Sequence, residues 1–97
     1  MTRTITLVLK ALSNPNRRRV FQFVCRGSDR RRGVTIDRIC RASRMKQPAV
    51  SHHVARLVEA GLILRRKIGW FVCCIPAPEG LAALKRFSRD PAGFPPK

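Results

Sequence analysis

Acidic residues are scarce in this chain, and their scarcity limits the functions that it can have. Only 5 Asp and Glu residues stand against 21 Lys and Arg residues among 97, so the formal net charge is +16. Such an excess in a short chain points to a polyanionic partner, most often nucleic acid. Five scattered carboxylates also provide no acid–base pair, and there is no Gly-rich phosphate loop. We therefore expect neither an enzyme nor a bound cofactor.

Long apolar runs and export signals are missing as well. No run approaches the roughly 18 apolar residues that a transmembrane helix needs. Lys10 interrupts the apolar patch near the start, and no small-residue cleavage site follows it, which argues against a signal peptide. The four cysteines, two of them adjacent, are then expected to be reduced thiols. We predict a cytoplasmic protein that makes no membrane contact.

The chain contains no internal repeat and no long linker. Its apolar content of 44% is ordinary, and 97 residues suffice for one domain with a modest core. We expect residues 1–88 to form that domain. Residues 89–97 are rich in proline and glycine and are expected to form a flexible tail.

Local signals predict five helices and one hairpin. Asn14 and Pro15 supply a cap and a first-turn proline, and Thr35 is placed to cap another helix. Two apolar runs around Gly69 indicate a β-hairpin. The first predicted helices are at 4–12 and from Pro15 to about Gly27, and a basic, turn-rich loop follows at 27–33. The next helix runs from Thr35 to Ser43, and a turn to Lys46 leads into a helix at 47–60. The hairpin at 62–76 and a helix at 78–87 complete the chain order.

The fourth predicted helix, QPAVSHHVARLVEAGLI from residue 47, is amphipathic. Val50, Val54, Leu57 and Val58 are spaced i, i+4, i+7 and i+8, which makes one apolar stripe. Gly61 is placed as a left-handed C-cap, and the residue after it can fold back on the last turn. The opposite face holds Pro48, His52, Ala55, Arg56 and Glu59, with Gln47 and Ser51 on one flank and His53 on the other.

The order of these elements defines an architecture. Two short helices joined by a tight turn, the second exposing polar residues in its N-terminal half, suit the major groove of DNA. A basic hairpin directly after them suits a wing that lies along the backbone or in the minor groove. The sequence therefore predicts a mainly α winged helix-turn-helix with about five helices and a two-stranded wing.

Two segments resemble the arsenic-repressor (ArsR) family of bacterial regulators. LKALSNPNRRRVFQFV is similar to that family's opening, where an Ala-Leu-x-x-Pro-x-Arg pattern leads into the second helix. QPAVSHHVARLVEAGLI is similar to its recognition helix, usually Val-Ser-x-His-Leu-x-x-Leu-x-x-x-Gly-Leu, and RRKIGWFVCCI stands where its wing does. The likeness covers about residues 8–87, and other winged-helix families, such as the multiple-antibiotic-resistance (MarR) group, share the helix pattern in weaker form.

This resemblance implies a homodimeric prokaryotic repressor, associated with the nucleoid, whose two recognition helices enter successive major grooves of an imperfect palindrome. Its partners would be double-stranded DNA and a second copy of the chain. Pairing two small domains raises specificity, because one domain reads few base pairs. The dimer would be built on the first and last helices, with the apolar residues Ile5, Val8, Leu9, Leu81, Leu84 and Phe87 at the interface.

The same resemblance assigns contacts to DNA. Gln47, Ser51 and His52 stand where the family reads base edges, and a glutamine can make a bidentate contact with adenine. His53 matches a common histidine of the family and is expected to contact a phosphate or to orient the helix through a hydrogen bond. Further phosphate contacts are expected from Lys46, Arg56, Arg65, Arg66 and Lys67, with Trp70 bracing the wing. The alternative is that the histidines and the wing cations are only solvated surface groups.

Neither of the family's usual metal sites is present. Aligned on the recognition helix, the positions of the family's Cys-x-Cys pair hold Thr35 and Asp37, and only Cys40 stands nearby. Softer metals need several thiolates together. The last helix offers only Glu79 toward the family's other site, which uses carboxylates and histidines. We therefore expect no metal.

Cys73 and Cys74 lie on a predicted strand, so one side chain should point inward and the other outward. An outward thiol in so positive a protein would have a lowered pKa and be reactive, which makes a thiol-redox-responsive repressor one alternative. The other is that these cysteines are small core residues. Cys25 lies near a redox position of some relatives, but the last helix has no cysteine to pair with it.

Two further functions remain open from the sequence. A non-specific DNA-coating or RNA-binding protein would use the charge of +16 without base readout, because phosphate contacts carry no sequence information. A protein–protein module would need an acidic partner for its exposed basic face.

Overall fold

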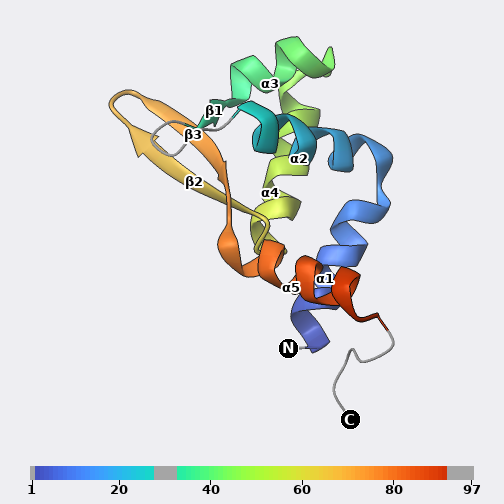
Figure 1. The fold of residues 1–97 in the computed structure, drawn as a ribbon. Coiled ribbons are helices and arrows are strands. Elements are labelled where there is room, and N and C mark those ends of the chain that lie inside the picture. The colour runs from blue at the N-terminus through green and yellow to red at the C-terminus, as the bar shows by residue number, and fades with distance from the viewer. Residues whose placement is uncertain (1, 28–32, 92–97) are drawn as a thin grey trace.

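The computed structural model describes residues 2–27 and 33–91. Its helices are α1 (Thr2–Ser13), α2 (Pro15–Gly27), α3 (Ile36–Ser43), α4 (Gln47–Glu59) and α5 (Pro78–Arg89), and its strands are β1 (Val34–Thr35), β2 (Ile63–Ile68) and β3 (Phe71–Pro76). In Figure 1, α1 and α5 lie side by side at one end, while α3, the start of α4 and the tip of the hairpin lie at the other. The predicted order of five helices and a hairpin is confirmed.

Parts of two predictions lie outside the described residues. The basic loop predicted at 27–33 is described only at its two glycines, and the predicted tail at 89–97 only as far as residue 91. The last helix runs to Arg89, one residue past the expected end of the domain. Within the described ranges, no helix is long and apolar enough to cross a membrane.

Side-chain caps set two helix starts, as predicted. Oδ1 of Asn14 accepts a hydrogen bond from the backbone N–H of Arg17 at 3.1 Å. Oγ1 of Thr35 accepts one from the N–H of Arg38 at 3.2 Å. These bonds satisfy amide donors that have no partner within the helix. The short turn from α3 to α4 then begins at Arg44, whose φ of 60° is a left-handed cap.

The predicted glycine cap ends α4 and also positions α5. Gly61 has a φ of 75°, and its N–H donates to the carbonyl of Val58 at 3.0 Å. The N–H of Leu62 donates to the carbonyl of Leu57 at 2.9 Å, which completes a Schellman motif. The Gly61 carbonyl accepts in turn from the N–H of Gly80 at 2.7 Å. A Cβ at Gly80 would lie 2.5 Å from that oxygen, so the close approach of α5 requires glycine.

The predicted hairpin is confirmed, and a third strand joins it. β2 and β3 pair antiparallel up to Ile68 and Phe71, which leaves Gly69 and Trp70 as a two-residue turn. Gly69 has a φ of 60°, the conformation that such turns require of their first residue. β1 pairs with the middle of β3, so the strand order is β1-β3-β2. The sequence pattern missed β1 because two residues are too few to display an alternation.

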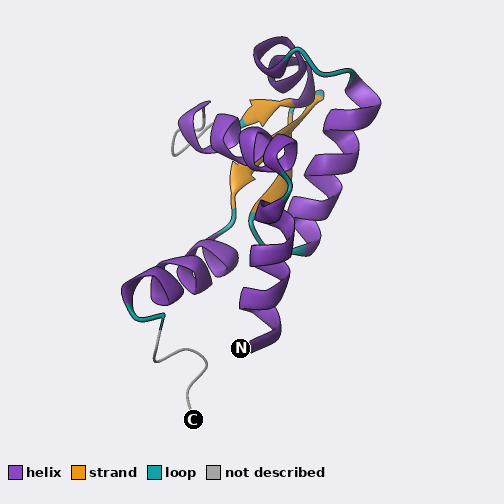
Figure 2. Ribbon diagram, turned by 90° about the vertical axis from the view of Figure 1, so that its right-hand side faces the viewer, coloured by secondary structure: helices purple, strands orange, loops and turns teal. Residues whose placement is uncertain are grey.

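One hydrophobic core joins the helices to the base of the hairpin, and in Figure 2 the strands lie behind α2. The predicted stripe of α4 lies in it, since Val50, Val54 and Leu57 are fully buried and Val58 packs on its edge. This anchors one face of α4 and leaves the other outward. The largest fully buried side chains are Val8, Val20, Val24, Ile39, Val50, Val54, Leu57, Leu62, Ile63 and Cys74.

Two residues expected at a dimer interface lie inside the protomer instead, which corrects that prediction. Ile5 and Val8 are 5% and 0% exposed and belong to the protomer's own core. Their i, i+3 spacing places both on the face of α1 that packs on the rest of the chain. The remaining predicted interface residues keep some apolar surface: Leu9 is exposed, and Leu81, Leu84 and Phe87 are partly buried.

Candidate nucleic-acid interface

The N-terminal half of α4 presents a polar surface. Lys46 and Gln47 are exposed where the helix begins, with Pro48 in its first turn. His52 is exposed further along the same surface, and Ser51 is half-buried beside it. Because the apolar stripe holds the helix on the core, these side chains face away from the protein. The structure thus brings together four of the residues predicted to contact DNA.

Arg56 extends this surface toward the end of α4. Its side chain is already paired with a carboxylate, which the sequence did not reveal. Its Nη1 lies 3.1 and 2.9 Å from the two carboxylate oxygens of Glu59. The two side chains are 50% and 60% exposed, so this ion pair adds little stability and exchanges readily in water. A phosphate would have to replace Glu59 as the partner of Arg56.

His53 lies inside the protein, which corrects its assignment as a DNA contact. It is 9% exposed, and its Nδ1 accepts a hydrogen bond from Nε of Arg17 at 3.4 Å. Burial lowers the pKa of His53 below its ordinary value of about 6.5, and the charges of Arg17 and His52 lower it further. Of the two predicted roles, the geometry provides the helix-orienting hydrogen bond, whereas a side chain that is 9% exposed offers little surface to a phosphate.

Two arginines of α2, both missed from the sequence, tie that helix to the helix-turn-helix. Arg17 bonds His53 on α4, and Nη2 of Arg19 donates to the carbonyl of Ser43 at the end of α3, at 3.5 Å. Ser43 is itself buried, and its Oγ accepts from the N–H of Met45 in the turn at 3.2 Å. The signal for Arg17 was present in the Pro-x-Arg spacing, which places it in the first turn of α2.

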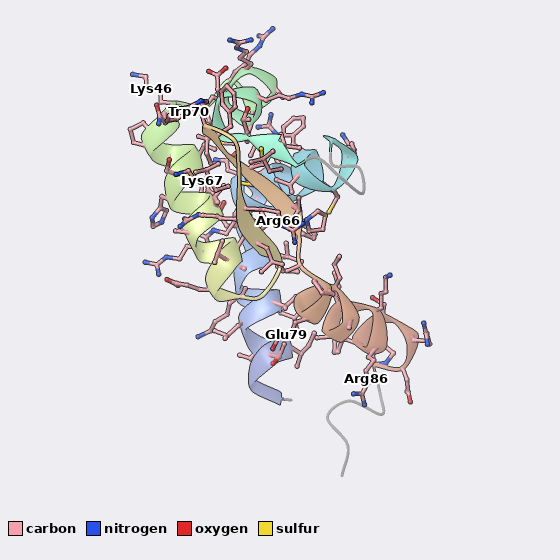
Figure 3. All side chains as sticks on the ribbon, turned by 90° about the vertical axis from the view of Figure 1, so that its left-hand side faces the viewer. Lys46, Arg66, Lys67, Trp70, Glu79 and Arg86 are labelled. Carbon is pink, nitrogen blue, oxygen red and sulfur yellow. The ribbon has the colours of Figure 1, made fainter. Side chains whose placement is uncertain are left out.

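The wing carries its three cations on two faces. Arg65, Arg66 and Lys67 are all exposed, and the alternation along β2 places Arg66 opposite the other two. Figure 3 shows Arg66 and Lys67 on opposite sides of the hairpin, with Trp70 at its tip. Trp70 is 94% exposed and does not brace the wing as predicted. As a turn residue it stands beyond the last cross-strand pair, Ile68 with Phe71.

Both adjacent cysteines are buried, which corrects the expectation of an outward thiol. Cys73 is 7% and Cys74 is 0% exposed. The chain entering β1 covers the second face of the strand, since a Cβ at Gly33 would lie 3.0 Å from Cβ of Cys73. Burial raises the pKa of Cys74 to about 11, against an opposing effect of Arg65, so this thiol is held protonated and unreactive. Within residues 2–27 and 33–91, no group of three or more His, Cys, Asp or Glu is placed to hold a metal.

A helix-turn-helix that presents a polar second helix, followed by a basic hairpin, is the architecture of winged-helix DNA-binding proteins. The chain belongs to the helix-turn-helix domain family, whose model matches residues 12–66, more than half of its length. Its resemblance to ArsR-family transcriptional regulators is confirmed, because solved structures of that family share its winged helix-turn-helix fold. No curated protein sequence matches the chain significantly.

Three solved structures show the extent of this likeness. An ArsR-like transcriptional regulator from Rhodococcus sp. RHA1 gives a TM-score of 0.77 at 18% identity, over 94% of this chain and 82% of that one. The homodimeric winged helix-turn-helix DNA-binding domain of a possible ArsR-family regulator from Mycobacterium bovis gives 0.70 at 22% identity, over 97% and 82%. A possible transcriptional regulator for arsenical resistance gives 0.70 at 29% identity, over 86% and 81%.

Proposed function

We propose that this protein is a sequence-specific DNA-binding transcriptional regulator that acts as a homodimer, most simply as a repressor that occupies its operator in the cytoplasm. The observation that carries the proposal is the exposed polar face of α4, which is held on the core by its buried stripe, bonded to α2 through Arg17 and His53, and followed by a basic wing. Readout of base edges in a major groove needs a helix held in this way. The net charge of +16 supports a phosphate-rich partner.

Each residue of this surface and of the wing has a role within this proposal. Gln47, Ser51 and His52 read base edges, and Gln47 is suited to a bidentate contact with adenine. Contacts to phosphate or to the minor groove come from Lys46, Arg56, Arg65, Arg66 and Lys67. His53 positions the helix and does not touch DNA.

The homodimer would use α1 and α5, which lie at the opposite end of the protomer from the hairpin tip (Figure 1). Leu9 is 41% exposed there, and Leu81 and Leu84 line an open hollow on α5. Homodimer interfaces cover apolar surface of this kind. The Mycobacterium bovis neighbour is described as homodimeric, which supports the same assembly here. The proposed DNA-contacting surface and the proposed dimer surface both lie within the domain predicted at residues 1–88.

Selection followed by measurement tests the proposal. Duplexes enriched by the protein from a random-sequence pool are compared with scrambled duplexes by fluorescence anisotropy at physiological salt. We expect the selected duplex to bind roughly 1000-fold more tightly. Gln47→Ala should lower that ratio by roughly 5- to 100-fold, because it removes a base contact. Gln22→Ala, which removes an exposed glutamine from α2, is the matched control and should leave the ratio unchanged.

The charge of +16 favours one second candidate, a non-specific DNA-coating protein. That candidate predicts no enrichment from the pool. Selected and scrambled duplexes would then bind alike and weaken together as salt rises, since counterion release drives both. Such a result would refute the sequence-specific regulator.

A further inference from the structure

The wing tip carries an exposed aromatic pair that the fold does not use. Trp70 is 94% and Phe71 is 66% exposed, and neither belongs to the core. Tryptophan is not among the residues that favour turns, which are Gly, Pro, Asn, Asp and Ser. Two more apolar side chains near the tip are also exposed: Ile68 and Val72. Exposed apolar surface of this kind marks a binding site.

The backbone presents this tip free of the rest of the protein. β1 pairs with β3 only at Cys73 and Cys74, so beyond those residues the hairpin is a two-stranded ribbon. The turn then sets Trp70 beyond the last pair of the ribbon. In Figure 3, Trp70 at this tip and Lys46 at the start of α4 lie at the same end of the molecule. A partner that spans this end can therefore meet both.

The charges near the tip select the class of that partner. Arg65, Arg66 and Lys67 are exposed on the same hairpin, and residues 63–76 contain no carboxylate. Like charge would repel a second copy of the wing, and a neutral apolar partner would leave the cations unmatched. A DNA duplex offers phosphates to the cations and stacked bases to the indole. Charge and aromaticity together therefore favour DNA.

We propose that Trp70 is a DNA-contacting residue that enters the minor groove beside the half-site held by α4 and stacks on a base step there. The inference rests on the proposed function and extends it to base pairs that α4 does not reach. Inserting an apolar side chain partly unstacks a step, and flexible pyrimidine–purine steps such as TA resist this least. Trp70 therefore gives the wing a sequence preference through the deformability of DNA.

The chain contains one tryptophan, so its indole emission reports on Trp70 alone. The full chain is titrated with the selected duplex, and the anisotropy of a label on the DNA is followed in parallel. Stacking should quench the indole emission as the anisotropy saturates. It should also protect the indole from quenching by acrylamide, because the side chain leaves water.

Substitutions give a second readout. Trp70→Ala should weaken binding of the selected duplex by roughly 5- to 100-fold, while Trp70→Phe should retain most of the affinity. Leu64→Ala, which trims an exposed apolar side chain at the other end of the same hairpin, is the matched control and should bind normally. Changing a flanking TA step to AA should lower the affinity of the wild-type protein for the duplex. It should lower the affinity of the Trp70→Ala variant less, because only the wild type inserts the indole.

The two proposals fail in distinguishable ways. If the anisotropy saturates while emission and acrylamide quenching stay unchanged, the role of Trp70 is overturned and the proposed function stands. If no duplex binds, the proposed function falls and this inference falls with it. Protection of Trp70 by vesicles of anionic phospholipid, and not by the duplex, would assign the tip to a membrane. If the protection of Trp70 from acrylamide rises with protein concentration in the absence of DNA, the tip contacts a second copy of the chain.

Discussion

The side chains of Arg17 and His53 join α2 to α4, with Nε of Arg17 3.4 Å from Nδ1 of His53. One residue belongs to the Pro-x-Arg motif and the other to the Ser-x-His motif, so the two segments that resemble the ArsR family meet in space. The bond requires a neutral imidazole, because a protonated ring has no acceptor nitrogen. The contact between α4 and α2, which the buried stripe of α4 also holds, is therefore sensitive to one titratable group.

Acid should weaken the fold through this pair. The pKa of His53 is lowered in the folded protein, by burial first and then by the charges of Arg17 and His52. At a pH between that lowered pKa and the unfolded value of about 6.5, the unfolded chain binds more protons at His53 than the folded protein does. The contribution of the neutral imidazole to the free energy of unfolding is therefore complete above 6.5. It decreases as the pH falls toward the pKa of the folded protein. Urea unfolding at about pH 8 and about pH 5 should show the loss, with a smaller loss in His53→Gln. Equal losses in both proteins would contradict the role of His53.

Gly80→Ala should destabilise the protein by clash. The added Cβ would lie 2.5 Å from the Gly61 carbonyl oxygen and 2.7 Å from its carbon, which are backbone atoms that no rotamer change can move. We expect a loss of roughly 2 kcal/mol or more in the free energy of unfolding. Gly69→Ala is the control, because no atom lies within 4 Å of its Cβ and only its φ of 60° opposes the change, at about 1 kcal/mol. Equal midpoints for the two variants in thermal unfolding would mean that α5 shifts without strain.

Leu9→Glu should dissociate the proposed dimer while the protomer stays folded. Leu9 is 41% exposed, so a glutamate there is solvated in the monomer but would be a buried, unpaired charge in an interface on α1. Leu64→Glu places the same charge at a leucine of similar exposure, 44%, on the wing. Sedimentation velocity should show a monomer for the first variant and a dimer for the second. A dimer that survives Leu9→Glu would move the interface away from α1.

Thiol labelling should separate the cysteines by burial. Cys25 is exposed, although desolvation raises the pKa of its thiol and slows its reaction, whereas Cys73 and Cys74 are buried. Iodoacetamide should modify Cys25 in the native protein and should reach Cys74, whose pKa is raised to about 11, only after unfolding in urea. Mass spectrometry of the peptides measures both rates. Rapid native modification of the adjacent pair would show that the strand opens.

The features predicted correctly depend on residues that are close in the chain. The cap at Asn14 reaches only to Arg17, and the cap at Gly61 reaches only into the last turn of α4. Hydrophobic spacing is equally local, which is why the stripe that begins at Val50 could be placed on the buried side of its helix. The exposure of Gln47 on the flank of that helix was predicted in the same way, and its contact with DNA stays a prediction.

The features that were missed depend on contacts with segments that are distant in the chain. Strand alternation predicted one outward cysteine, but the chain entering β1 closes that face over Cys73. Helical spacing set His53 on a flank of α4, yet Arg17 from α2 encloses it there. Ile5 and Val8 were recognised as an apolar face, and only the packing of α1 shows that the protomer itself buries them.

The sequence by itself determined the order of the helices and their caps, the turn at Gly69, the amphipathic α4 and the basic charge, because each arises from local propensity, spacing or composition. Tertiary structure alone decided which apolar and titratable groups are buried, where β1 pairs and that Trp70 stands uncovered at the wing tip. Burial is a relation between segments that are distant in the chain, and no periodicity within one segment encodes which neighbour will cover it.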